Sequence, residues 1–304
     1  MPKKIKLILN PTANHGRSVQ IAADLRPLMA EHNADWSGTD YPAHAIELAR
    51  QAGEQGYDLV IAVGGDGTVH EVVNGLMQVP QEKRPALGII PLGSGNDFAH
   101  ILGIPASPVD ALKSAINGQP RSLDMASVCD EKGRLEYFNN TIGIGFDAAV
   151  NAYTRQIKHI HGFMMYFVAL IQTIFRRFDA LDMHVETDQE TWDLNALMLA
   201  VGNGPREGGG FIVTPEAKLD DGILNYVTIR KISRLMMLRL VPEVMNGTHG
   251  RFKDVKMGTC RRLSVTCKQP LVVHCDGEVY AGFGTDVRQL KIELYPNAIH
   301  FMKA

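Results

Sequence analysis

The sequence predicts an α/β protein, with an N-terminal doubly wound parallel sheet followed by a C-terminal β-sandwich domain. Two observations support this fold class. Before Arg121, apolar strand-like runs alternate with segments of helical spacing, which is the pattern of a parallel sheet covered by helices. From Arg121–Asp124 onward, short alternating segments separated by turn signals dominate. The 304 residues suffice for two domains of ordinary size.

Hydrophobic spacing defines the elements of the first part. The run "YDLVIAVGG" is apolar almost throughout, as expected for a strand buried on both faces of a parallel sheet. The run "AHAIELARQAGEQG" has the spacing of an amphipathic helix. In chain order we expect a strand over 4–11, a helix over 18–32, a strand over 35–39, a helix over 43–56, a strand over 57–65, a helix from Gly67 and a strand from Ala86.

The second part reads as many short strands interrupted by two helical insertions. The alternating segments that we expect to form strands are 137–146, 182–188, 196–203, 222–229, 262–268, 271–280 and 289–296. The helical insertions lie around 153–178 and 232–245. A domain boundary is therefore expected after Asp124, with a β-rich domain over 125–295.

Three predicted strands of the first part end in polar or glycine-rich loops. These loops are Asn10-Pro11, Gly64-Gly65-Asp66 and the run 93–97. The carboxyl ends of parallel strands meet at one edge of the sheet, where ligands bind in such folds. Glycines let the backbone approach a phosphate, and a helix N-terminus attracts it. The loops match neither the P-loop motif, whose lysine is missing, nor Gly-x-Gly-x-x-Gly.

Two aspartates in these loops indicate a cation. Asp66 taken alone fits equally well as the N-cap of a helix and as a functional carboxylate. Asp97 follows the second glycine loop, which should face the same crevice. Two carboxylates beside a polyphosphate would repel it unless a divalent cation lay between them, and Mg²⁺ takes such ligands. The sequence therefore favours a site for a nucleotide with Mg²⁺.

Composition and charge exclude several classes of protein. The formal net charge of −2 argues against binding nucleic acid through overall charge. The four cysteines are too sparse for a disulfide framework and fit a reducing compartment. Cys260, Cys267, His274 and Cys275 lack a Cys-x-x-Cys pair, so we interpret the thiols as buried side chains rather than zinc ligands.

No segment of the sequence has the features of a signal peptide or a membrane span. The apolar run after the first two lysines is too short for a signal peptide. The longest apolar stretch, Gly162–Phe175, is about half the length that crosses a bilayer. We therefore expect a cytoplasmic protein, with peripheral attachment to the inner face of the membrane left open.

An ordered set of motifs resembles one known family, the bacterial diacylglycerol kinase-like lipid kinases, which are relatives of sphingosine and ceramide kinases. Gly-Gly-Asp-Gly-Thr alone also occurs in NAD kinases, but the ordered set is far more specific. Its members are "NPTANHG" (10–16), "GGDGTVHEVVNGL" (64–76), "PLGSGNDFA" (91–99), "IGIGFDAAV" (142–150), the run from "GNGPREGGGF" to "KLDDGIL" (202–224) and "DGE" (276–278).

The resemblance implies an ATP-binding catalytic domain over 1–124, to which the last residues, about 296–304, return, and a lipid-binding domain over 125–295. Asp66 and Asp97 would anchor a catalytic Mg²⁺, partly through water. Two departures are mild: Ala13-Asn14 replaces a frequent Ser-Gly, and Ser94 replaces a frequent threonine. The implied contacts to ATP are Asn10, Thr39, Gly65, Asp66, Gly67, Thr68, Glu71, Ser94, Gly95 and Asn96.

The resemblance also assigns two acidic sites in the second part. A structural Mg²⁺ would bind the Lys218 carbonyl, the Asp221 carboxylate and the Ile223 carbonyl, where the residues alone suggest a plain turn. Glu278 would be the general base that takes the proton of the acceptor hydroxyl, where a lone Asp-Gly-Glu is usually a hairpin turn. Asp276 would orient that site.

A lipid substrate needs an apolar site or a membrane surface. Gly162–Phe175 fits either a buried core helix or a flap over an acyl-binding cleft. The stretch from Arg230 to Lys268 contains ten basic residues and two acidic ones, so it could dock on anionic lipids. Nucleic acid is not expected as a partner, because no recognition motif accompanies the basic residues. The oligomeric state, including a homodimer, is left open.

Three functions therefore remain on the sequence alone. The first is an ATP- and Mg²⁺-dependent kinase of diacylglycerol or a related lipid, with a place in phospholipid biosynthesis. The second is a kinase of NAD or another small metabolite, since the same glycine loop serves there. The third is a non-catalytic sensor of nucleotide or lipid, against which the presence of Asp66, Asp97 and Glu278 together argues.

Overall fold

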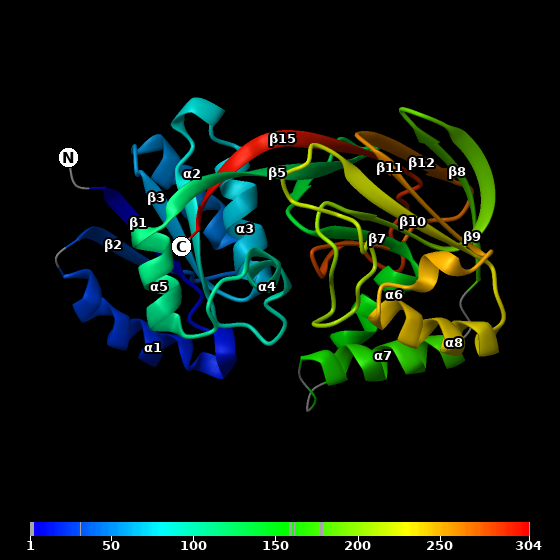
Figure 1. Ribbon diagram of the computed structural model, residues 1–304, viewed down its shortest axis with the longest axis horizontal. Coiled ribbons are helices and arrows are strands. Elements are labelled where there is room, and N and C mark those ends of the chain that lie inside the picture. The colour runs from blue at the N-terminus through cyan, green and yellow to red at the C-terminus, as the bar shows by residue number, and fades with distance from the viewer. Residues whose placement is uncertain (1–2, 31, 158–159, 161, 177–178, 304) are drawn as a thin grey trace. The chain divides into compact units, whose positions relative to one another are not determined.

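The computed structural model describes residues 3–30, 32–157, 160, 162–176 and 179–303. The chain divides into two compact units (Figure 1). Unit 1 comprises Met1–Asp124 and Pro296–Ala304, and unit 2 comprises Met125–Tyr295. Strand β5 (Gln119–Asp130) carries the chain from unit 1 to unit 2, and β15 (Gln289–Lys303) carries it back. The predicted fold class, a parallel α/β unit followed by an antiparallel β unit, is confirmed.

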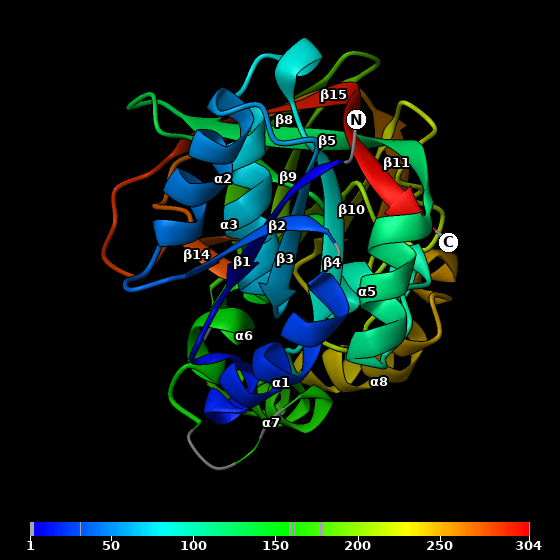
Figure 2. The ribbon, with the colours of Figure 1, turned by 90° about the vertical axis from the view of Figure 1, so that its left-hand side faces the viewer.

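Unit 1 is a parallel sheet with helices on both faces. Its strands lie in the order β2-β1-β3-β4, and β15 adds to the edge at β4. Helices α1 and α5 cover one face, and α2 and α3 cover the other (Figure 2). The elements are β1 Lys4–Leu9, α1 Ser18–Leu25, β2 Asn33–Gly38, α2 His44–Glu54, β3 Leu59–Gly64, α3 Asp66–Met77, β4 Ala86–Pro91, α4 Asp97–Leu102 and α5 Pro108–Asn117.

Burial on both faces of the sheet explains why these strands could be predicted from the sequence. Every residue of β3 is buried, because helices cover both faces of the sheet. The helix expected over 18–32 is shorter than predicted. Helix α1 ends at Leu25 and continues as a 3₁₀ turn, Arg26–Met29, in which Pro27 has no N–H to donate. Three further 3₁₀ turns are Ala13–Gly16, Gln81–Lys83 and His249–Arg251.

Unit 2 is built from antiparallel strands. They pair in the order β14-β13-β7-β9-β8-β12-β15, and β10 lies between β9 and β11. An apolar core that includes Phe138, Val201 and Leu263 fills this unit. The remaining strands are β6 Leu135–Phe138, β7 Thr141–Gly145, β8 Leu181–Thr187, β9 Thr191–Gly202, β10 Leu224–Arg230, β11 Val255–Cys260, β12 Arg262–Cys267, β13 Val273–Cys275 and β14 Glu278–Ala281.

Three helices of unit 2, α6 (Phe146–Thr154), α7 (Phe163–Phe175) and α8 (Arg234–Met245), form a second apolar cluster with strands β9 and β10 (Figure 1). Helix α6 begins before the predicted insertion, at the end of a segment predicted as a strand. Residues 158–159, 161 and 177–178 of that insertion lie outside the described residues.

Helix α7 is not the buried core helix that one interpretation of its sequence suggested. Its buried residues are Ala169, Thr173 and Ile174, whereas Met164 is 53% exposed and Phe175 is 61% exposed. One face of this apolar helix therefore packs and another is open to solvent. Within the part of the chain that the structure describes, no helix is both long enough and apolar enough to cross a membrane.

Arg84 joins the end of α3 to the returning strand β15. Its guanidinium donates to the carbonyls of Leu76 and Val79 at 2.9 Å each, and also to that of Ala298. Arg84→Met keeps the length of the side chain and leaves these carbonyls without their donor. We expect the free energy of unfolding, measured with urea, to fall by about 2–4 kcal/mol. Lys83→Met, at the exposed neighbouring position, should change it little and serves as the control.

Candidate functional site

The loops that follow β3 and β4 pack backbone against backbone. A Cβ atom added to Gly93 would lie 2.5 Å from the Cα of Gly65, and one added to Gly65 would lie 2.9 Å from the Cα of Gly93. Asn96 closes the second loop, because its Nδ2 donates to the Gly93 carbonyl at 2.7 Å and its Oδ1 accepts the Gly93 N–H at 2.9 Å. The two predicted glycine loops therefore lie in contact at one edge of the sheet.

Asp66 and Asp97 both lie beside Gly95. A Cβ atom added to Gly95 would lie 3.0 Å from Oδ2 of Asp66 and 3.7 Å from Oδ2 of Asp97. The N-cap of α3 is Gly65, so interpreting Asp66 as that N-cap is wrong. Its Oδ1 instead accepts the N–H of Phe98 at 3.3 Å, in the first turn of α4. Asp66 thus links the start of one helix to the start of another.

The surroundings of Asp66 disfavour its negative charge. Burial is the main cause and the Asp97 carboxylate is the second, and together they raise the pKa of Asp66 to about 6. The N–H groups at the start of α4 act in the opposite direction. A divalent cation between the two carboxylates would offset their repulsion, and oxygen ligands of this kind suit Mg²⁺. The residues present therefore fit the predicted cation.

Asn10 and Thr68 come together from two different loops. Nδ2 of Asn10 donates to Oγ1 of Thr68 at 3.2 Å, and Oδ1 of Asn10 accepts the N–H of Thr12 at 3.0 Å. Thr68 fills the space next to Gly64, where an added Cβ would lie 2.3 Å from its Oγ1. Asn14 has a φ of 51°, which asparagine tolerates, so it can replace a glycine in this loop.

Three other residues that were predicted to contact the nucleotide lie in three different segments of unit 1. Gly67 lies in the first turn of α3, whose amides have no partner within the helix and can bind an anion. Ser94 is exposed at the tip of the second loop. Thr39 follows β2, and its N–H donates to the Leu9 carbonyl at 2.8 Å.

Glu71 points toward another helix. Its carboxylate accepts the N–H groups of Ala43 at 3.0 Å and Ala45 at 3.2 Å, at the start of α2. An acidic group at this position stabilises the helix N-terminus. The side chain of Glu71 is therefore occupied within unit 1, although it was predicted to contact ATP.

In unit 2, Asp276 and Gly277 form a two-residue hairpin turn between β13 and β14. Cys275 pairs with Glu278, and φ is positive at both central residues, 50° at Asp276 and 83° at Gly277. The Asp276 carboxylate accepts three backbone N–H groups at 2.9–3.0 Å. These donors belong to Asn139, Asn140 and Thr141. Asp276 therefore ties the turn to the segment before β7.

Glu278 follows this turn with an accessible carboxylate. Its side chain is 48% exposed, and its Oε2 lies 2.8 Å from Nη2 of Arg155, which is 55% exposed. An ion pair between two side chains this exposed contributes little to stability. Glu278 therefore remains accessible to an incoming molecule.

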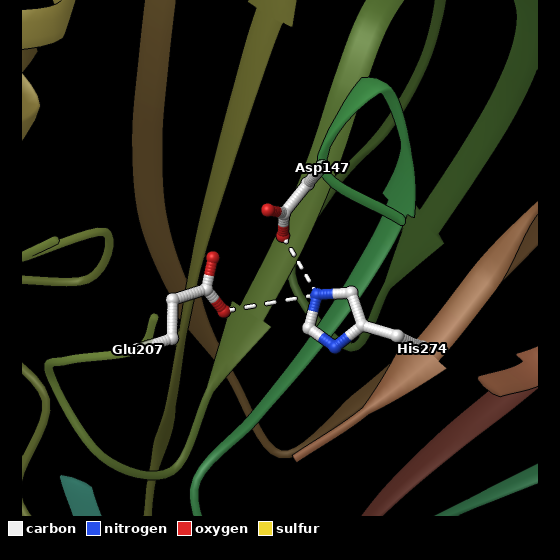
Figure 3. A group of neighbouring side chains, drawn as sticks. All are labelled: Asp147, Glu207 and His274. Atoms are coloured by element: carbon white, nitrogen blue, oxygen red, sulfur yellow. Dashed lines mark hydrogen bonds and ion pairs between the residues drawn. The ribbon is translucent and has the colours of Figure 1, made fainter. Parts of the chain in front are cut away.

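Three titratable side chains of unit 2 lie together: His274, which is buried, and the partly buried Asp147 and Glu207 (Figure 3). Nε2 of His274 lies 3.0 Å from Oδ2 of Asp147 and 3.8 Å from Oε2 of Glu207, and Thr141 donates its hydroxyl to Glu207 at 2.7 Å. Burial raises the pKa of Asp147, but His274 outweighs it and lowers that pKa overall. Burial and Asp147 raise the pKa of Glu207 well above its usual range.

None of these three residues was predicted to have a role in the site, although each lies in or beside one of the motifs quoted above. His274 was considered only together with cysteines, as a zinc ligand. A partial signal was Asp147, an acidic residue in the first turn of α6 just after β7, whereas the pairing of His274 in β13 with Gly143 of β7 follows only from the fold. Glu207, in the loop after β9, had no local signal.

The predicted structural Mg²⁺ ligands lie on the turn before β10. Oδ1 of Asp221 accepts the N–H of Ile223 at 3.2 Å, and Gly222 has a φ of 73°. This is the side-chain turn that aspartate favours. Lys218 and Asp221 are exposed, and their role as Mg²⁺ ligands, together with Ile223, stays a prediction.

Comparison with known proteins gives consistent matches to both units. Residues 4–128 match the family model described as diacylglycerol kinase catalytic domain, and residues 140–303 match the YegS C-terminal NAD kinase beta sandwich-like domain. The chain is 32% identical to a "Probable lipid kinase YegS-like" of Yersinia pestis, over 87% of this chain and 83% of that protein. It is 38% identical to a protein of the same name from Chromohalobacter salexigens, over 69% of this chain and 65% of that one.

Solved structures share the fold. A diacylglycerol kinase of Bacillus anthracis superposes with a TM-score of 0.74 at 22% identity, covering 100% of this chain and 97% of that one. A yeast NADH kinase superposes with a TM-score of 0.52 at 11% identity, covering 100% of this chain and 84% of that one. At these identities the likeness concerns the fold alone.

Proposed function

Because the chain belongs to the family of diacylglycerol kinase-like lipid kinases, we propose that it transfers the γ-phosphoryl group of ATP to a hydroxyl group of diacylglycerol or a related lipid. Membership of this family makes the chain a phosphotransferase. The observation that carries the proposal is the pair Asp66 and Asp97, held beside Gly95 where the two glycine loops touch.

The residues of unit 1 would hold the donor. The first-turn amides of α3 would face the phosphates, with Asn10 and Thr68 fixed beside them. Asp66 and Asp97 would hold Mg²⁺, which would neutralise charge on the phosphates and polarise the transferred group. Burial of Asp66 favours this role, because a cation relieves the energetic cost that burial imposes on its charge.

Glu278 would act on the acceptor. Its carboxylate would take the proton of the lipid hydroxyl while the oxygen bonds to the γ-phosphorus and the bond to ADP breaks. The exposed carboxylate and its pairing with Arg155 support this role, because they place an acidic side chain at the surface of unit 2, where an acceptor can reach it. Asp276 would orient it through the three amides that it binds.

A membrane surface would supply the lipid. Met164 and Phe175 of α7 and Leu235 of α8 expose 53%, 61% and 79% of their surface, and the exposed Arg234 and Arg239 lie on α8. Apolar side chains beside basic ones suit an anionic lipid surface. We propose a cytoplasmic protein that docks peripherally on such a surface.

The decisive experiment measures ADP release by the purified protein with ATP, Mg²⁺ and a panel of acceptors. We expect turnover with diacylglycerol or a related lipid in anionic vesicles, a mass increase of one phosphate in that lipid, and little turnover in zwitterionic vesicles. Glu278→Gln should lower turnover by about 100- to 10,000-fold and keep nucleotide binding. Glu186→Gln, at an exposed position of β8 in unit 2, is the control.

The same panel tests the other candidates. Turnover with NAD and none with lipids would replace the proposal by a small-metabolite kinase. Nucleotide binding without turnover on any acceptor would replace it by a sensor.

A further inference from the structure

The backbone of Gly277, the residue before Glu278, is held at its N–H and at its carbonyl by two buried side chains from outside the turn. Nδ2 of Asn151, on α6, donates to the Gly277 carbonyl at 2.8 Å. The Gly277 N–H points at Nδ1 of His274 at 3.3 Å. Since Asn151 and His274 are both at most 4% exposed, their positions are set by packing. The direction in which Glu278 leaves the turn therefore depends on them.

The contact with Gly277 determines where His274 carries its hydrogen. An N–H that points at Nδ1 requires the lone pair of that nitrogen, so the ring hydrogen lies on Nε2. Nε2 in turn faces Oδ2 of Asp147 at 3.0 Å and accordingly donates to it (Figure 3). The chain of contacts runs from the Gly277 N–H through the ring to Asp147.

Two effects oppose each other at this ring. Burial disfavours a charged imidazole, whereas the carboxylates of Asp147 and Glu207 favour one and act to raise the pKa of His274. A second proton would sit on Nδ1 and face the Gly277 N–H. Because the pairing of Cys275 with Glu278 fixes the direction of that N–H, we assign the neutral ring with its hydrogen on Nε2.

This assignment argues against a metal at the group formed by Asp147, Glu207 and His274. One imidazole nitrogen and two carboxylates are suitable ligands for a divalent transition metal. A ligating histidine donates its other ring N–H to a neighbour, however, whereas the other ring nitrogen here accepts one. The nitrogen that faces the carboxylates carries the hydrogen and has no lone pair to offer.

We propose that His274 is a positioning residue for Glu278. It holds the Gly277 amide, and Asp147 and Glu207 hold the ring in the orientation and tautomer that this requires. The inference rests on the proposed role of Glu278 as the general base. A displacement of a catalytic carboxylate by about 1 Å can cost about 100-fold in rate, so the effect of losing this contact should be measurable.

Two substitutions at His274 separate the contacts of its two nitrogens. Asparagine places an amide oxygen near the position of Nδ1 and can accept the Gly277 N–H, while glutamine reaches toward the position of Nε2 and contacts Asp147. We expect His274→Gln to lower kcat by about 10- to 100-fold with an unchanged KM for ATP. His274→Asn should retain most of kcat at a similar melting temperature. Equal kcat values for His274→Gln and wild type would overturn the proposal.

A double-mutant cycle with Glu278→Gln tests whether His274 acts through Glu278. In the Glu278→Gln background, His274→Gln should cause no further loss, whereas losses that multiply would show a general structural role and overturn the proposal. Full turnover of Glu278→Gln alone would instead remove the base role, and the inference with it. If His274→Gln does not fold, Asn151→Leu removes the other contact to Gly277 and takes its place in the cycle.

The nitrogen chemical shifts of His274 give a measurement that is independent of turnover. Two-bond ¹H–¹⁵N spectra at the pH of the assay should show a neutral ring with its hydrogen on Nε2. An imidazolium signal, or a hydrogen on Nδ1, would overturn the proposal even if the variants lose activity.

Discussion

Replacing Asp66 by asparagine is expected to slow phosphoryl transfer severely and, at neutral pH, to make the protein more stable. Asparagine removes one of the two carboxylates beside Gly95, so we expect turnover with ATP and Mg²⁺ to fall by about 100-fold or more. Asp66 is partly shielded from solvent next to Asp97, and its charge costs free energy in the folded protein. The substitution removes that cost together with the function.

The sign of the pH dependence follows from the direction of the pKa shift. The pKa of Asp66 is raised to about 6 in the folded state, against about 3.9 in the unfolded chain, so the folded state binds more protons between these values. The unfolding free energy of the wild type therefore falls relative to that of Asp66→Asn as pH rises from about 4 to 6. At about 1.4 kcal/mol per pKa unit, the difference reaches up to about 3 kcal/mol above pH 6.

Urea unfolding of both proteins from pH 4 to 8, without Mg²⁺, measures this difference. Asp110→Asn is a matched control, because Asp110 is also in the first turn of a helix but is exposed. It should change neither turnover nor the pH profile of stability. Adding Mg²⁺ with nucleotide should stabilise the wild type more than Asp66→Asn. Parallel pH profiles for wild type and Asp66→Asn would contradict the burial of a charged Asp66.

The fold was predictable where burial on both faces leaves a continuous apolar run. Strand β3 is an example, since each of its residues is buried. Strand β5 was missed because its first three residues are exposed and its apolar residues do not alternate with polar ones. Phe146 was assigned to a strand because it continues the apolar run of β7, whereas it begins α6. Spacing cannot distinguish these cases over so short a length.

The candidate site was predictable to the extent that its residues lie in local loops. The glycine loops identified Asp66 and Asp97, but the hydrogen bond from Phe98 to Asp66 joins segments 32 residues apart and has no local signature. Glu71 has the same limitation, because its partners at the start of α2 are 26 and 28 residues away. Side-chain partners of this kind follow from tertiary packing.

Gly93→Ala is expected to have a large effect, through the backbone alone. The added Cβ would lie 2.5 Å from the Cα of Gly65, closer than real Cβ atoms approach other atoms, so the two loops must separate. We expect a loss of about 1–3 kcal/mol in unfolding free energy and a fall in turnover of about 100-fold. Gly38→Ala, at a position with no heavy atom within 4 Å of the added Cβ, should change neither and serves as the control.

Comparing Gly93→Ala with Gly95→Ala separates two effects: moving the two loops apart, and crowding the carboxylate of Asp66. A Cβ at Gly95 would touch Oδ2 of Asp66 at 3.0 Å without touching the backbone of the other loop. Gly95→Ala should therefore weaken the activation of turnover by Mg²⁺ while the unfolding free energy falls less than in Gly93→Ala. If both variants lose unfolding free energy and turnover in the same proportion, the two substitutions act in the same way, and the backbone contact between Gly65 and Gly93 has no separate role.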